Sequence, residues 1–233
     1  MLAQKMFLIE DTIATQDAAL IALAVPVAGG FEDAIDDYKD FVKEEHDLKV
    51  KKENNTTYII EVVDMPHVSI KRGDLKTYLF HTDTAEVMAF CFQLGYDIFL
   101  STAEYPTEMS QFKKFVIKYL EHHYKNHYQG RIDLLTRDFD QYKKDLGQNE
   151  KEINGLKKKV ATIDKKLLKE KDEIKITKLN SDKQLLENEI EQLSNLLPDK
   201  RELVHEKEQE IAAVKDEYHQ MHLSIGALDP DRQ

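Results

Sequence analysis

Residues 128–167 read YQGRIDLLTRDFDQYKKDLGQNEKEINGLKKKVATIDKKL, the clearest periodic pattern in the chain. Apolar residues recur in it at alternating steps of four and three, which is the heptad spacing of a coiled coil. We call these positions the seam. Asn149 is a polar member of the seam, and it either sets the register or partner of the helix or is simply exposed. The seam positions are Tyr128, Ile132, Leu135, Phe139, Tyr142, Leu146, Asn149, Ile153, Leu156, Val160, Ile163 and Leu167.

The seam loses its phase between residues 169 and 177. Later apolar positions, within 176–221, are offset by two residues, which fits neither common insertion in a coiled coil. A chain reversal here would fold the two arms together as a hairpin, although no Gly or Pro marks a turn. Pro198 is a second candidate for a break. The other arrangement that covers the seam is pairing between two chains. Branched residues at the first apolar position of each heptad (a) and leucine at the second (d) favour such pairing.

The distribution of aromatic residues separates this helix from a globular domain. Nine of the ten Phe and eight of the ten Tyr lie before residue 129. Lys, Glu, Asp, Leu and Ile dominate the remainder, so only the first half can build a conventional core. We predict a globular domain at 5–127, a coiled coil or helical hairpin at 128–222 and a disordered tail at 223–233.

The apolar pattern within the globular domain predicts an α+β fold, with an antiparallel sheet and two helices. Helical spacing from Phe31 onwards predicts a first helix that ends near His46. The alternation from 88 to 98 predicts a strand with one face in the core. The second helix begins after Pro106 and continues into the seam without a linker. Short apolar runs bounded by turn residues predict strands within 6–9, 18–27, 48–52, 57–64, 68–81 and 86–100.

The charge of the chain excludes some classes of partner. The formal net charge is −11, with 13 basic and 21 acidic residues in 1–130 against 20 and 23 in 131–233. A negative domain repels phosphate backbones, and the coil interleaves both signs, so we expect no nucleic-acid partner. The longest apolar run, 18–27, is shorter than the roughly 18 residues of a membrane span. The expected partner is a protein or a second copy, bound through the coil.

Histidines are the sharpest candidates for chemistry. His123 and His127 are four residues apart on one helix face and, with His122 beside them, have metal-ligand spacing. Two ligands do not make a catalytic site, and tyrosine stands where the zinc-protease motif requires Glu. We therefore interpret them as solvated histidines at the point where the helix leaves its domain. His219 and His222, three apart, are interpreted in the same way, as part of a fraying helix end.

No other motif predicts catalysis. Cys91 is the only cysteine, so no internal disulfide forms, and its apolar surroundings predict a small buried hydrophobe. The triplet Arg72-Gly73-Asp74 falls between strand segments, where a turn explains it. The sequence contains no Gly-rich phosphate loop and no nucleophile elbow. We predict no catalytic, cofactor-binding or metal-binding residue, and no enzyme.

Four short stretches precede the long helix: DMPHVS at 64–69, TYLF at 77–80, CFQLGYDIFLS at 91–101 and EYP at 104–106. With these four stretches in this order, followed by the long helix, the chain resembles an uncharacterised family of secreted or periplasmic bacterial envelope proteins. Members of that family have a signal peptide, a small α+β domain and a long Lys/Glu-rich coiled coil. The resemblance implies a periplasmic or cell-envelope location, with residues 2–4 as the remainder of a removed signal. Cytoplasmic residence is the alternative, because the charged and apolar regions of a signal are absent.

Three classes of function remain. The first is a non-enzymatic interaction or scaffold protein of the bacterial cell envelope, whose coil mediates self-association or partner binding. The second is a small-molecule or lipid-binding domain with a coiled-coil extension. A cavity lined by Phe90, Phe92 and Tyr96 would favour it, whereas a sheet face filled by aromatic residues of the second helix would favour the first class. The third, a metal-dependent hydrolase, rests on the histidines alone. We predict the first.

Overall fold

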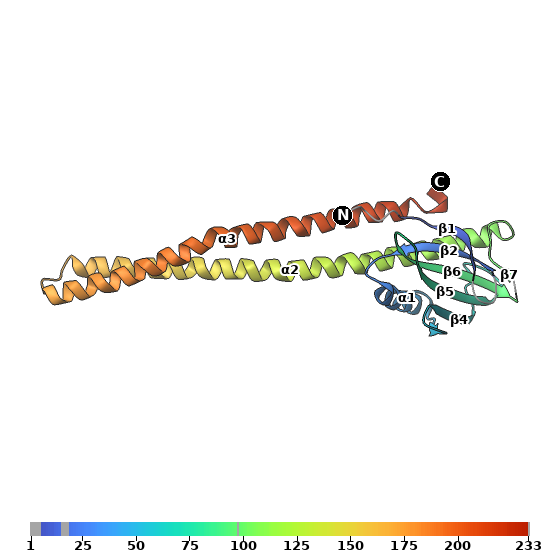
Figure 1. Ribbon diagram of the computed structural model, residues 1–233, viewed down its shortest axis with the longest axis horizontal. Coiled ribbons are helices and arrows are strands. Elements are labelled where there is room, and N and C mark those ends of the chain that lie inside the picture. Colours follow the sequence, from blue (N-terminus) through green and yellow to red (C-terminus); the bar gives the residue numbers. More distant parts are fainter. Residues whose placement is uncertain (1–5, 15–18, 97, 233) are drawn as a thin grey trace. The chain divides into compact units, whose positions relative to one another are not determined.

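The structure, a computed structural model, describes residues 6–14, 19–96 and 98–232, so the predicted signal remnant lies outside the described residues. Its α+β class is as predicted, and its three α-helices, of 16, 62 and 54 residues, hold more than half of the 233-residue chain. The elements are β1 (Ile9–Ala14), β2 (Ala19–Val27), α1 (Phe31–His46), β3 (Lys51–Lys52), β4 (Thr57–Val63), β5 (Gly73–His81), β6 (Glu86–Gly95), β7 (Ile98–Phe99), α2 (Pro106–Leu167), α3 (Glu173–Gly226) and the 3-10 helix η1 (Pro230–Arg232), labelled in part in Figure 1.

The chain forms two compact units. The first comprises residues 1–130 together with 215–233, and the second comprises 131–214. This division differs from the predicted segments 5–127, 128–222 and 223–233, because the last turns of α3 and η1 belong to the first unit. Ile225 is 1% exposed, and Asp231 Oδ2 lies 2.5 Å from Lys114 Nζ. Packed helical residues therefore occupy much of the segment in which we expected a disordered tail.

The sheet is antiparallel throughout, as predicted. Its strand order is β1-β2-β6-β5-β4-β3, and β7 also pairs with β6. The register of β2 with β6 sets Leu23 opposite Phe90 and Ala24 opposite Ala89. Because successive side chains of a strand point to opposite faces, large residues gather on one face of these central strands and small residues gather on the other.

Helices α1 and α2 pack on the face of large residues. The ring of Phe90 lies 5.4 Å from that of Tyr38 on α1 and 5.3 Å from that of Tyr119 on α2. Phe92 makes an edge contact with Phe112 of α2 at 5.9 Å. All five rings are among the largest fully buried side chains. Each such ring buries about 150–250 Å², so this interface is the main aromatic core.

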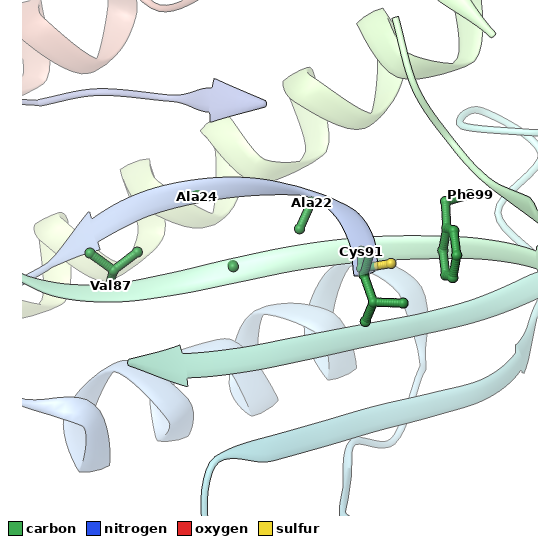
Figure 2. Packing of buried hydrophobic residues seen from close by; sticks show 7 residues of the cluster. Ala22, Ala24, Val87, Cys91 and Phe99 are labelled. Atoms are coloured by element: carbon green, nitrogen blue, oxygen red, sulfur yellow. The ribbon is translucent and has the colours of Figure 1, made fainter. Parts of the chain in front are cut away.

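The opposite face carries a second cluster of buried residues, which are mostly small. We expected the strand within 86–100 to have only one face in the core, and that is wrong, because partly buried residues of β1, β2 and β5 pack around this cluster. The strand also ends at Gly95, and Tyr96 is 95% exposed. Figure 2 shows the cluster: Leu20, Ala22, Ala24, Val87, Ala89, Cys91 and Phe99.

The edge strands differ in how well they were predicted. The β3–β4 hairpin is as expected, with Lys51 opposite Ile59. The first strand, expected within 6–9, is instead β1, which pairs along β2 from Ile9 to Ala14.

No helix in the described ranges has an apolar stretch long enough to cross a bilayer.

Candidate functional site

Residues 131–214 form an antiparallel helical hairpin. α2 ends at Leu167, the chain turns through residues 168–172, and α3 begins at Glu173 and returns along α2 (Figure 1). The turn falls at the start of the region in which the seam loses its phase. Pro198, the second candidate for a break, lies inside α3.

Two ion pairs between the arms show the register of the hairpin. Lys183 Nζ lies 2.7 Å from Asp164 Oδ1, near the turn. Farther along the arms, Arg201 Nη2 lies 2.9 Å from Glu150 Oε1. The two pairs are separated by 14 residues on α2 and by 18 on α3, so the arms stay in nearly the same antiparallel register over this length.

Side-chain caps make the turn without Gly or Pro. Glu170 Oε1 accepts hydrogen bonds from the backbone N–H groups of Lys171 and Asp172, at 3.0 and 3.2 Å. Asp172 Oδ1 then accepts from the backbone N–H groups of Ile174 and Lys175, at 3.0 and 3.4 Å. An Asp that bonds the first N–H groups of a helix is an N-cap. Asp172 is therefore the sequence signal that locates the start of the returning arm.

The hairpin leaves much of its seam only partly covered. Within 131–214 the only buried apolar side chains are Ile153, Leu156 and Val214. Two helices cover each other along one line, so seam residues at the rim of a two-helix contact keep part of their surface in water, and further helices packed against the hairpin would cover them. The other seam positions of α2 after Tyr128 and the later apolar positions along α3, which we also count as seam, are half-buried: Ile132, Leu135, Phe139, Tyr142, Leu146, Asn149, Val160, Ile163, Leu167, Ile176, Leu179, Leu186, Ile190, Leu193, Leu197, Val204 and Ile211.

A line of exposed leucines runs along α3 outside the seam. Leu185, Leu196 and Leu203 are 65%, 48% and 38% exposed. They are spaced by 11 and 7 residues, and at about 100° per residue this spacing places all three within about 20° on one face of the helix. We call them the outer leucine line. It lies about 100° around α3 from the seam residues beside it, so the partner arm does not cover it.

The structure gives His123 a role that the sequence did not predict. Its side chain is fully buried, so the expectation of a solvated residue is wrong. Its Nε2 accepts the backbone N–H of Ala28 at 3.1 Å, and its Nδ1 lies 2.7 Å from Asp37 Oδ2. An amide N–H can only donate, so the proton of the ring is on Nδ1, which donates to Asp37. Both nitrogens are used, and neither can bind a metal.

The other histidines do not complete a site with His123. His122 Nε2 lies 3.1 Å from Asn126 Nδ2, and His219 and His222 are exposed near the end of α3. In the part of the chain that the structure describes, no group of three or more His, Cys, Asp or Glu is arranged to hold a metal ion.

A stacked histidine pair joins two segments that are distant in sequence. The rings of His46, at the end of α1, and His67, after β4, lie 4.9 Å apart at 12°. Partial burial lowers the pKa of both rings, and Lys118 lowers both further. His67 also lowers the pKa of His46, while Glu45 raises it. Their 21-residue separation gives no motif, so sequence analysis missed them.

The Arg-Gly-Asp triplet is part of the fold. A Cβ atom at Gly73 would clash with the carbonyl oxygen of Gln93, so only glycine fits at this point of β5, where it pairs with β6. Asp74 Oδ1 accepts the backbone N–H of Val62 at 2.8 Å. Arg72 Nη2 lies 3.2 Å from Asp64 Oδ2. Each member of the triplet thus has a structural partner.

Cys91 is buried within the cluster of small residues. Desolvation raises the pKa of its thiol to about 12, against a smaller opposing effect of Lys76. The thiolate that nucleophilic chemistry requires is therefore not formed at neutral pH.

No family model, curated protein or solved structure matches this chain. The function is therefore inferred from the geometry of the hairpin and of the aromatic core.

Proposed function

We propose that this is a non-enzymatic interaction or scaffold protein, whose hairpin associates with the helices of a second copy or of a partner protein. One observation carries the proposal: the hairpin has two incompletely covered apolar surfaces, the half-buried seam and the outer leucine line. Large contiguous exposed apolar patches mark interaction sites, and here three exposed leucines share one face of α3 beside the half-buried seam.

The energetics favour association through these surfaces. Full burial of a leucine contributes about 1.5–3 kcal/mol, and the outer leucine line holds three that are at least one third exposed. They span 18 residues, or about 27 Å of helix. A second hairpin laid along this line would complete a four-helix assembly, in which each seam gains a further helix against it.

The packing of the aromatic core argues against the ligand-binding alternative. Phe90 and Phe92, which were expected to line a cavity, are buried against rings of α1 and α2. Tyr96 lies 95% exposed, away from them. The aromatic residues of α2 thus occupy the position in which a ligand would bind.

A location in the bacterial cell envelope is part of the proposal, and the family resemblance at residues 64–106 supports it. Antibody detection after fractionation of the source cells measures the location directly. We expect the protein in the periplasmic or envelope fraction, and recovery with cytoplasmic markers would contradict this.

Sedimentation velocity across a range of protein concentrations tests association. We expect the wild-type chain to form a dimer or larger assembly, and the Leu196→Glu/Leu203→Glu variant to shift towards monomer. The matched control, Gln184→Glu/Asn195→Glu, adds the same two charges to another face of α3 and should associate like the wild type. Equal weakening by both variants, or a wild type that stays monomeric at every concentration, would contradict self-association.

A further inference from the structure

The two ends of the hairpin differ in charge. Its turn end, residues 157–183, contains ten lysines and five Asp or Glu, a net charge of +5. The rest of 131–214 contains eight basic and fourteen acidic residues, a net charge of −6. We call these parts the basic end and the shaft. A chain with a net charge of −11 thus concentrates positive charge at one end of its hairpin.

Most lysines of the basic end are available to an external anion. Glu170 and Asp172 cap the backbone of the turn, and Asp172 Oδ2 also lies 4.0 Å from Lys175 Nζ. Asp164 pairs with Lys183. Eight exposed lysines have no carboxylate within 4.0 Å among the described residues: Lys157, Lys158, Lys159, Lys165, Lys166, Lys169, Lys171 and Lys178.

Two large aliphatic side chains project from the same turn. Leu168 is 87% exposed and Ile174 is 81% exposed, and they stand on either side of the capped residues. A cavity of about 570 Å³ opens between the two arms near this turn, and five lysines line it together with two carboxylates, Glu170 and Asp182. The basic end therefore carries both anion-binding and exposed apolar side chains.

We propose that the basic end of the hairpin docks on the surface of an anionic phospholipid bilayer. The lysines contact the lipid phosphates, Leu168 and Ile174 enter the boundary between headgroups and acyl chains, and the lysine-lined cavity receives a headgroup. Basic clusters with apolar residues bind such surfaces by combining electrostatic attraction with apolar burial. A nucleic-acid backbone would satisfy the lysines and leave both aliphatic side chains in water, so the bilayer fits the surface better.

This inference is independent of association through the outer leucine line, because it uses other residues at another part of the hairpin. The test is flotation of the full chain with large unilamellar vesicles at 100 mM salt, with phosphatidylcholine alone or with 30% phosphatidylglycerol. We expect the chain to float with the anionic vesicles and to stay behind with the neutral ones. Absence of binding to the anionic vesicles overturns the proposal.

Matched variants locate the contact. Each lysine near an anionic surface strengthens binding about fivefold, so Lys166→Gln/Lys169→Gln/Lys171→Gln should weaken vesicle binding about 100-fold. The control replaces three basic residues of the shaft, as Lys143→Gln/Lys144→Gln/Lys151→Gln, and should bind like the wild type. An equal loss in both variants would mean adsorption without a defined site, and it would overturn the proposal.

The aliphatic pair has its own test. Leu168→Asn/Ile174→Asn should weaken vesicle binding at least about tenfold, because apolar burial is lost. Both side chains are exposed, so circular dichroism should show unchanged helix content. Wild-type binding by this variant overturns insertion. Retention of 30-base-pair duplex DNA by the wild type, without vesicle binding, would assign the lysines to nucleic acid instead.

Discussion

The buried pair of His123 with Asp37 predicts a specific loss of stability on replacing Asp37 by Asn. The Asp37 carboxylate is 17% exposed and accepts two hydrogen bonds at 2.7 Å, from His123 Nδ1 and from Asn126 Nδ2. An amide presents one oxygen and one NH₂, so one of these donors would face another donor. A hydrogen bond to a charged group contributes about 1.5–3 kcal/mol. We expect a loss of about 2 kcal/mol, or about 30-fold in the unfolding equilibrium.

The neighbouring Asp36→Asn is the control. Asp36 is 65% exposed and pairs with Lys39 one turn away, so its replacement should change stability by less than about 0.5 kcal/mol. Urea unfolding followed by tyrosine fluorescence is a suitable assay, because eight of the ten tyrosines lie before residue 129. Equal stability of the two variants would contradict a stabilising role for the two hydrogen bonds to the Asp37 carboxylate.

Three further tests address Gly73 in β5, the pair of His46 with His67, and the hairpin. Gly73→Ala should destabilise the first unit by about 1–3 kcal/mol, because its Cβ would overlap the neighbouring strand. Gly130→Ala has open space around the new Cβ and should stabilise the helix by about 0.5–1 kcal/mol. Urea titration of the two variants compares their free energies of unfolding. His46 and His67 have lower pKa values folded than unfolded, so unfolding takes up protons below about pH 6.5 and stability falls as the pH falls. Melting curves of a His46→Gln/His67→Gln variant between pH 7.5 and 5 should show a shallower decline. Leu156→Ala, at a position 5% exposed, should destabilise the hairpin by about 2–4 kcal/mol in denaturation followed at 222 nm.

Periodicity predicted the parts of this fold that repeat locally. The spacing of the seam identified the long helix, and its loss of phase located the reversal to within a few residues. The apolar spacing alone could not fix the turn more closely; the signal that does so is the N-cap Asp172, and no Gly or Pro accompanies it. The seam phase also continues through Pro198, and the structure keeps this proline inside α3.

Contacts between residues far apart in the chain could not be predicted from the sequence. His123 is 86 residues from Asp37 and 95 from Ala28, and no sequence motif links either residue to it. The second buried face of β6 was missed because its members are small, and alternation between large and small apolar residues resembles a strand with one wet face. Ile225 was expected in a disordered segment, because its burial depends on tertiary packing.

The proposed function depends on the reversal of the chain, and a distance between the two arms measures that reversal. Spin labels at Lys144 and His205, both exposed, lie on opposite arms at positions that the pairs Glu150–Arg201 and Asp164–Lys183 bring into register. The only native cysteine, Cys91, is buried and leaves labelling specific.

Double electron–electron resonance measures the separation of these labels, with excess unlabelled protein added to suppress signals between chains. Packed helix axes are about 8–10 Å apart, so an intramolecular hairpin predicts a label distance below about 30 Å that persists on dilution. A helix that continued without reversal would separate the labels by about 90 Å. That long distance, or a short one that disappears on dilution, would contradict the hairpin.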